Sequence, residues 1–286
     1  MSKKRTAPKT ETAPQIFEIF GVPISEEDFK ERIKGAQCPY MGKDCDGGGN
    51  RYSSKIKIGQ GHRLKDFFLN KDSVIAGVCS IKLANDTSPW IVCPRRLLVF
   101  SDNLSDSQKD VRDAIWKTLG YKEEDEIKIW PEVRIQLKEE DKLLEYTFDY
   151  VVMKGEEISV IEVMTSSTSG GNKEKETTIS KAFENSIIKG EHVAPNINKR
   201  QVWARMASQL IAKSQLAKHW GGKALWIIQD VLADYISKTT ALSLREGSEE
   251  SNEINFLVFA HDNNNLKFKG LYSGPISSCD INEERG

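Results

Sequence analysis

Asp149 and Glu162 lie on the two arms of a predicted β-hairpin, within the segment EYTFDYVVMKGEEISVIEVM. Gly155 predicts a two-residue type II′ turn, because glycine supplies the positive φ that the first central position requires. This turn pairs Lys154 with Glu157, and the same register places Asp149 directly opposite Glu162, with Cβ atoms about 4.5 to 5.5 Å apart. We therefore expect the two carboxylates to share one face of a sheet.

This carboxylate pair suggests phosphoryl chemistry. Two like charges among Phe148, Val151 and Val160 would destabilise a simple hairpin, and a divalent cation bound between them would offset the repulsion. Mg2+ prefers oxygen ligands. Held against a phosphate, it polarises the phosphoryl oxygen and lowers the pKa of an attacking water, as phosphodiester hydrolysis requires. The alternative is an edge hairpin with two solvated carboxylates, and a one-residue slip would place the pair on opposite faces.

Several strands and helices must position this hairpin. Residues 106–120 predict a helix closed by Gly120, because Val111, Ile115 and Leu119 recur at helical spacing. A shorter helix is expected within 25–35, where Ser25 begins a capping pattern. The order of the elements predicts a mixed β-sheet flanked by helices, an α/β fold. Strands are expected from 132, 145, 158 and 223, helices over 173–189 and 198–219, and a C-terminal hairpin around 262–265.

A stretch with basic residues and no acidic ones predicts contact with phosphates. No Asp or Glu occurs from His192 to Gln229. A one-signed stretch in a chain with 41 basic and 42 acidic residues is typical of a local nucleic-acid footprint, although a basic, solvated helix face would look the same. The basic residues of this stretch are Lys199, Arg200, Arg205, Lys213, Lys218 and Lys223.

Composition places the 286-residue chain among globular proteins, with no apolar run long enough to span a membrane and no signal-peptide pattern at its start. We therefore expect a cytoplasmic protein. In a reducing compartment its five cysteines are buried side chains or metal ligands rather than disulfides. Residues 37–96 are rich in glycine, cysteine and turns, so this segment needs something other than a large core to hold it together.

The order of these parts resembles the NotI family of type II restriction endonucleases, which belong to the PD-(D/E)xK superfamily. In that superfamily a strand Asp and a Glu-x-Lys on the partner strand hold the catalytic metal, and FDYVVM followed by VIEVMTSSTSGG matches this pattern. The resemblance assigns Asp149 and Glu162 to the Mg2+ site and adds Glu132 from the preceding strand. Met164 departs from it, because the family carries Gln and the superfamily Lys at this position. A methionine can neither accept a proton nor donate to a phosphate.

The cysteines also resemble the family's N-terminal four-cysteine site, in the contexts QCPY, KDC, GVCS and VCPRRL. The resemblance implies that Cys38, Cys45, Cys79 and Cys93 hold Fe or Zn in a structural role, since tetrahedral thiolate sites suit either ion. Cys279 would be an uninvolved thiol. Arg95, Arg96 and Lys55 near this site are candidates for positioning base-reading side chains.

The resemblance implies a homodimer that binds double-stranded DNA at a palindromic, possibly GC-rich site, with one strand cut by each subunit and a cognate methyltransferase in the host. Phosphates would be bound by Lys199, Arg200 and Arg205. The expected division is a flexible tail at 1–14, an N-terminal region at 15–100 with the four-cysteine subdomain, and a nuclease core at 101–286. Two alternatives remain open, a non-enzymatic zinc-ribbon DNA-binding protein and a non-specific nuclease of the same superfamily.

Overall fold

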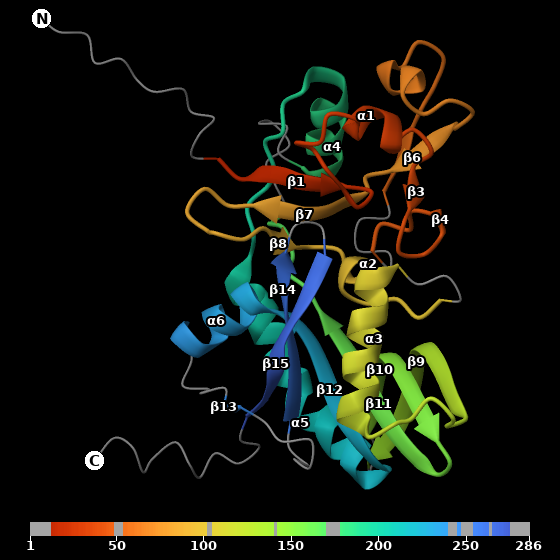
Figure 1. The fold of residues 1–286 in the computed structure, drawn as a ribbon, viewed down its shortest axis with the longest axis vertical. Helices are drawn as coiled ribbons and strands as arrows, with labels where there is room; N and C mark the ends of the chain where they lie inside the picture. The colour runs from red at the N-terminus through yellow and green to blue at the C-terminus, as the bar shows by residue number, and fades with distance from the viewer. Residues whose placement is uncertain are drawn as a thin grey trace, which may run out of the picture. The chain divides into compact units, whose positions relative to one another are not determined.

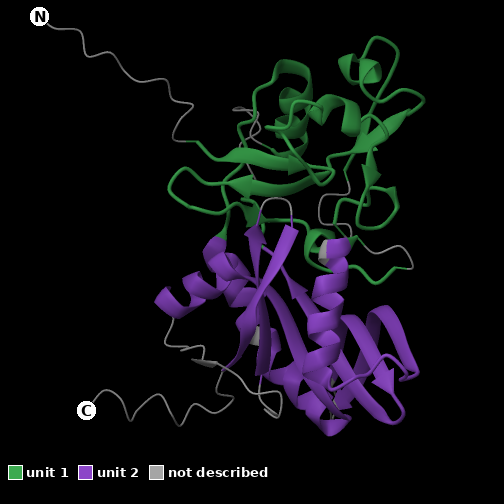
Figure 2. Cartoon of the chain, viewed as in Figure 1, with its two compact units in different colours: residues 1–105, 166–198 green, residues 106–165, 199–286 purple. Residues whose placement is uncertain are grey.

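The computed structural model describes residues 13–48, 54–101, 105–139, 142–169, 178–239, 245–246, 254–262 and 265–274 (Figure 1). The fold is mixed α/β, as the sequence predicts, with several sheets and helices. The chain divides into two compact units (Figure 2): residues 1–105 and 166–198 form unit 1, and residues 106–165 and 199–286 form unit 2. The division expected at residue 101 differs from this one at 166–198, which pack with the N-terminal part of the chain.

Unit 1 is built from short antiparallel strands. Four of them form a sheet in the order β2-β1-β7-β8, and β3 with β4 and β5 with β6 form two further pairs. Its strands are β1 (Gln15–Ile19), β2 (Val22–Pro23), β3 (Gln37–Cys38), β4 (Lys43–Asp44), β5 (Lys55–Lys57), β6 (Ser73–Ile75), β7 (Val78–Lys82) and β8 (Trp90–Ile91). Its helices are α1 (Phe29–Arg32), the 3-10 helix η1 (Arg63–Asp66), α2 (Pro94–Leu97) and α4 (Ile179–Lys189).

Two helices of unit 1 differ from the sequence-based expectation. The helix expected over 173–189 is α4, which begins at Ile179 after the capping residue Thr178, while 173–177 lie outside the described residues. The helix expected within 25–35 shortens to α1, which follows Asp28 rather than Ser25 and has no side-chain cap.

Unit 2 contains a seven-stranded sheet in the order β13-β15-β14-β12-β11-β10-β9. Its pairs are antiparallel except β11 with β12 and β12 with β14, which are parallel. The strands are β9 (Ile127–Glu139), β10 (Lys142–Lys154), β11 (Glu157–Met164), β12 (Gly221–Gln229), β13 (Arg245–Glu246), β14 (Ile254–Asp262) and β15 (Asn265–Gly274). The helices are α3 (Asp106–Leu119), α5 (Lys199–His219) and α6 (Asp230–Thr239).

Helices cover both faces of this sheet at its centre. Every residue of β12 from Ala224 to Gln229 is buried, as expected for a strand with a helix on each side. Helix α3 packs on β15, while α5 packs on β11 and β12, and Figure 1 shows α3 and α5 on opposite faces. Gly120 ends α3 in the left-handed conformation (φ 71°), which confirms the predicted helix end. No helix in the described part of the chain is long and apolar enough to cross a membrane.

Candidate metal and phosphate site

The hairpin that carries the two carboxylates has the predicted turn and register. Gly155 adopts a positive φ of 60°, and the strand ladder runs from the pair Lys154–Glu157 to the pair Tyr150–Ile161. The next two residues in this register are Asp149 and Glu162, so the structure brings the predicted pair to the end of the ladder. There the side chain of Asp149 accepts a 2.7 Å hydrogen bond from the backbone N–H of Val163.

Glu162 is a buried carboxylate with one oxygen bound and one without a partner. Its side chain is 5% exposed, and Oε2 accepts a 2.6 Å hydrogen bond from Nζ of Lys213. Oε1 is buried and has no hydrogen-bond partner among the described residues. Burial, and then the charge of Asp149, raise the pKa of Glu162 to about 8. A cation near Oε1 would offset the two effects that raise this pKa, because it stabilises the ionised carboxylate.

Lys213 lies beside the carboxylate pair, a position that its sequence pattern did not predict. Its Nζ donates to Glu162 and, at 2.6 Å, to the backbone oxygen of Thr147. We expected this residue in a basic stretch facing phosphates, whereas its side chain is 4% exposed inside unit 2. A signal was present, because Lys213 continues the buried stripe of Met206, Leu210 and Ala217 on α5. A lysine on such a stripe must be paired with an acceptor.

Glu132, the third predicted carboxylate, differs from Asp149 and Glu162 in its exposure and backbone conformation. It is opposite Asp149, between the paired residues Pro131 and Val133, but its side chain is exposed. Its φ of 52° is unusual for a residue with a side chain and costs about 1–2 kcal/mol. The described residues contain no group of three or more His, Cys, Asp or Glu arranged to hold a metal ion. The metal role expected for Glu132 therefore stays a prediction.

The strand β10 is irregular near Asp149, beside the unusual backbone conformation of Glu132. Phe148 and Val151 belong to one buried cluster, although three residues apart they would face opposite sides of a regular strand. The change of face falls between Phe148 and Val151, across the ladder from the positive φ of Glu132. Backbone outliers of this kind are concentrated at functional sites.

The basic residues expected to bind phosphate lie at the start of α5. Arg200 and Arg205 are exposed, Lys199 is half-buried, and the first turn of the helix has no acidic residue. Farther along, Lys218 is exposed, whereas Nζ of Lys223 donates to the backbone oxygen of Thr118.

The four cysteines of unit 1 line one small cavity of about 10 Å³. Cys38 lies in β3, Cys45 follows β4, Cys79 lies in β7 and Cys93 precedes Pro94 at the start of α2. None of these four forms a disulfide, and all but Cys45 are buried. Cys279 lies outside the described residues.

Glycines let the backbone approach these sulfurs. Gly48 has a φ of 75°, and a Cβ added there would lie 3.3 Å from Sγ of Cys93. The N–H of Gly21 donates to Sγ of Cys79 at 3.3 Å, and the N–H of Gly47 donates to Sγ of Cys45 at 3.4 Å. Backbone donors of this kind stabilise thiolate ligands.

Burial and hydrogen bonding shift the pKa values of the four thiols. Burial raises the pKa of Cys38 to about 11 and that of Cys45 to about 12. A hydrogen bond between Cys79 and Cys93 raises the pKa of Cys79 and lowers that of Cys93. Sγ of Cys79 also donates to the backbone oxygen of Gly77. The described residues, these four cysteines included, contain no group of three or more His, Cys, Asp or Glu arranged to hold a metal ion.

Arg96 does not reach a surface, contrary to our expectation. It is fully buried and pairs with Glu18, which is also buried, at 3.3 Å. Its guanidinium lies 5.3 Å from the centroid of the Tyr40 ring. Arg95 pairs with Asp46 at 3.0 Å, and Lys55 is exposed. Arg96 is therefore part of the interior that supports the cysteine cluster, and it is not available to read bases.

Comparison with known proteins adds no family assignment. No protein-family model matches the chain, and no curated protein sequence matches it. The role of each residue must therefore be judged from the geometry above and from the motif residues themselves.

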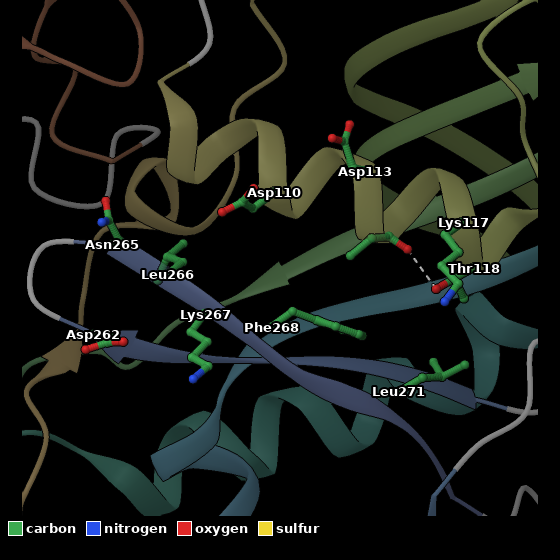
Figure 3. A pocket seen from close by; sticks show the side chains of 11 residues that line it. Asp110, Asp113, Lys117, Thr118, Asp262, Asn265, Leu266, Lys267, Phe268 and Leu271 are labelled. Carbon is green, nitrogen blue, oxygen red and sulfur yellow. Dashed lines mark hydrogen bonds between the residues drawn. The ribbon is translucent and has the colours of Figure 1, made fainter.

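A larger hollow in unit 2 lies away from the carboxylate pair. It has a volume of about 760 Å³ and is enclosed by α3 and the β14–β15 hairpin (Figure 3). Its charged side chains are of both signs, among them Asp110, Asp113 and Lys117 of α3 and Lys267 of β15. Neither Asp149 nor Glu162 lines it. The mixed charge gives it no preference for a phosphate, so we place the candidate site at the hairpin.

Proposed function

We propose that this protein is a Mg2+-dependent, sequence-specific endonuclease of the type II restriction class, which hydrolyses phosphodiester bonds in double-stranded DNA. The observation that carries the proposal is Glu162, a buried carboxylate near Asp149 with one oxygen unpartnered among the described residues. Such a group is costly unless it meets a donor or a cation. Carboxylate oxygens are the ligands that Mg2+ prefers.

The fold of unit 2 supports this proposal. In chain order, unit 2 contains helix α3, the antiparallel strands β9, β10 and β11, helix α5 and the parallel strand β12, with α4 of unit 1 between β11 and α5. They form a mixed sheet flanked by helices, which is the arrangement that the resemblance to restriction endonucleases implies. The carboxylates lie on adjacent strands within it.

Each carboxylate would act as a ligand. Bound Mg2+ supplies Lewis-acid polarisation of the phosphoryl oxygen and of an attacking water. Asp149 and Glu162 would hold the ion beside the scissile phosphate. Hydrolysis then forms a bond from the water oxygen to phosphorus as the bond to the leaving oxygen breaks, and water loses one proton while the leaving oxygen gains one.

DNA would be bound by α5 of each subunit in a two-fold symmetric dimer. Lys199, Arg200 and Arg205 would contact phosphates, which fix the register but carry no sequence information. Two copies of the chain, each cutting one strand, would match a palindromic site. A methyltransferase that protects the host DNA completes this proposal.

The four cysteines would hold a structural Zn or Fe ion in unit 1. Four sulfur donors around one cavity, with backbone N–H groups directed at two of them, suit a tetrahedral thiolate site. The described strands of unit 1 are two to five residues long, so such a cross-link would add stability that its small sheets do not supply.

The first test is digestion of a large phage DNA by the full chain with Mg2+. The comparison includes Asp149→Ala, Glu162→Ala and an EDTA control. Asp234→Asn is the matched control variant, because Asp234 is an exposed carboxylate on α6 whose ion pair with Lys238 is 3.8 Å long. We expect discrete fragments from wild type and from Asp234→Asn, and intact DNA in the other three reactions.

Other results would select other functions. A continuous smear that needs Mg2+ and both carboxylates would indicate a nuclease without sequence specificity. Intact DNA under every condition, together with DNA binding that needs no Mg2+ and survives Asp149→Ala, would replace the proposal by a non-enzymatic DNA-binding protein.

A further inference from the structure

Met164 leaves the carboxylate pair without a polar group at the position two residues after Glu162. The two side chains lie on the same side of β11 by strand alternation, but a thioether has no proton to donate. A different residue supplies a donor at the same carboxylate. That residue is Lys213, which comes from α5 rather than from the sheet.

Three contacts fix the ammonium of Lys213 against both arms of the hairpin. Nζ donates at 2.6 Å to Glu162 of β11 and at 2.6 Å to the backbone oxygen of Thr147 in β10. It also lies 5.3 Å from the centroid of the Phe148 ring. Thr147 and Phe148 directly precede Asp149 in the chain, so the ammonium is anchored at the carboxylate pair.

The charges balance only when this lysine is counted. Ionised Asp149 and Glu162 carry two negative charges, and Lys213 carries one positive charge. A divalent cation and one phosphodiester then bring the assembled group to neutrality. Without the lysine, the same assembly would keep one uncompensated negative charge in a buried place, which is costly.

A purely structural role explains Lys213 less well. Its neighbours on the buried stripe of α5 are Met206, Leu210 and Ala217. Replacing a buried ion pair by packed apolar side chains is often neutral or stabilising. Packing alone would therefore favour an apolar side chain at this position of α5. A role in the reaction explains why Lys213 and Glu162 are paired there instead.

We propose that Lys213 is a catalytic lysine, which acts from α5 in place of the motif residue that Met164 does not supply. The inference rests on the proposed nuclease function. The ammonium donates a hydrogen bond to the water oxygen that attacks phosphorus and offsets negative charge that grows on the phosphoryl oxygens. It gives up no proton, so the proton balance of the hydrolysis is unchanged.

The test separates chemistry from binding and folding. Single-turnover cleavage in Mg2+, DNA affinity in Ca2+ and thermal unfolding are measured for the full chain and for Lys213→Met. Lys238→Met is the control, because Lys238 is exposed on α6. We expect Lys213→Met to cut about 100-fold or more slowly with unchanged DNA affinity, as for loss of a group that acts in the transition state. Lys238→Met should match wild type in all three measurements.

A second variant keeps the proposal testable if Lys213→Met does not fold. The double variant Lys213→Met, Met164→Lys returns an ammonium to the strand beside Glu162, and we expect it to fold and to cut at a tenth of the wild-type rate or faster. A folded Lys213→Met protein that cuts within threefold of wild type would overturn the role of Lys213 alone. Where Lys213→Met is unfolded, a folded double variant that binds DNA but does not cut would do the same. Failure of wild type to cut any DNA would overturn the proposed function, and this role with it.

Discussion

Glu162 combines burial, a neighbouring carboxylate and one unpartnered oxygen, and these features predict how cation binding depends on pH. Its pKa is raised to about 8, so the group is largely protonated at neutral pH when no cation is bound. A cation binds the ionised form and must displace the proton. We expect the affinity for Mg2+ or Ca2+ to rise up to about tenfold per pH unit from about pH 6 to about pH 8, and to level off above.

Calorimetric titration of the full chain with Ca2+ at several pH values measures this dependence. Asp234→Asn should show the same slope, because its carboxylate is remote from the pair in the chain and exposed. Glu162→Gln should lose the slope together with most of the affinity. An affinity that is constant across this range would show that Glu162 does not exchange a proton for the cation.

At the scale of single residues, the sequence predicts what is close along the chain. The pairing of Asp149 with Glu162 follows from one glycine turn, because register propagates strictly from a two-residue loop. Lys213 joins the same site from a helix 51 residues away from Glu162. Its contact with Glu162 depends on how α5 packs on the sheet. The periodicity of α5 predicts which face of the helix is buried, but not which residues of the sheet that face contacts.

Among the elements, β12 is held to β11 by a close backbone approach at Gly222. The ladder shifts between Ile158 and Val160, and β12 has an extra residue there, as in a β-bulge. A Cβ at Gly222 would clash with the backbone oxygen of Ile158 and would lie 2.7 Å from Oγ of Ser159. We expect Gly222→Ala to lower the unfolding free energy of unit 2 by about 2–3 kcal/mol, through backbone displacement.

Gly155→Ala is the matched control for this substitution. Unlike Gly222, Gly155 has a positive φ, of 60°, and a Cβ there would meet no atom within 4 Å. Its cost should be only the conformational penalty of about 1 kcal/mol. Urea unfolding of the two variants measures the difference, and equal destabilisation would mean that β12 tolerates the added methyl group.

Element by element, the prediction succeeds where a pattern is long. Helix α3, β10, β11, β12 and the β14–β15 hairpin lie close to where their periodicity and turns place them, whereas β9 begins at Ile127 rather than at the predicted Glu132. Helix α1 is only four residues long, because a capping pattern at Ser25 does not by itself bury a helix face. Short strands such as β3 and β4 have too few residues for any periodicity.

Over the whole molecule, the path of the chain is the feature that local patterns leave open. The chain leaves unit 1 after 105, returns for 166–198 and leaves it again. Phe183 of α4 explains the return, because its ring stacks on Phe68 at 6.1 Å and meets Phe20 edge-on at 5.7 Å. These contacts join residues that are more than 100 positions apart, and no turn or periodicity in the sequence encodes them.

At the scale of unit 1, the cysteine cluster is where a bound metal ion would act on stability. Four largely buried thiols around one cavity would exchange their protons for a metal ion, and structural thiolate sites contribute about 10 kcal/mol or more of binding free energy. We expect about one Zn or Fe ion per chain. Cys93→Ser should retain less than a tenth of it and should lose the cooperative unfolding of unit 1.

Elemental analysis by mass spectrometry and thermal unfolding measure both effects on the purified full chain. Cys279→Ser is the control, because this thiol lies in the C-terminal tail outside the four, and it should keep both the metal and the unfolding transition. Dialysis of wild type against a chelator should reproduce Cys93→Ser, and returning the metal should restore the transition. If Cys93→Ser instead retains the metal content and melting of wild type, the four thiols are buried side chains without a ligand role. The ion that is recovered then decides between Zn and Fe, a choice that four sulfur donors leave open.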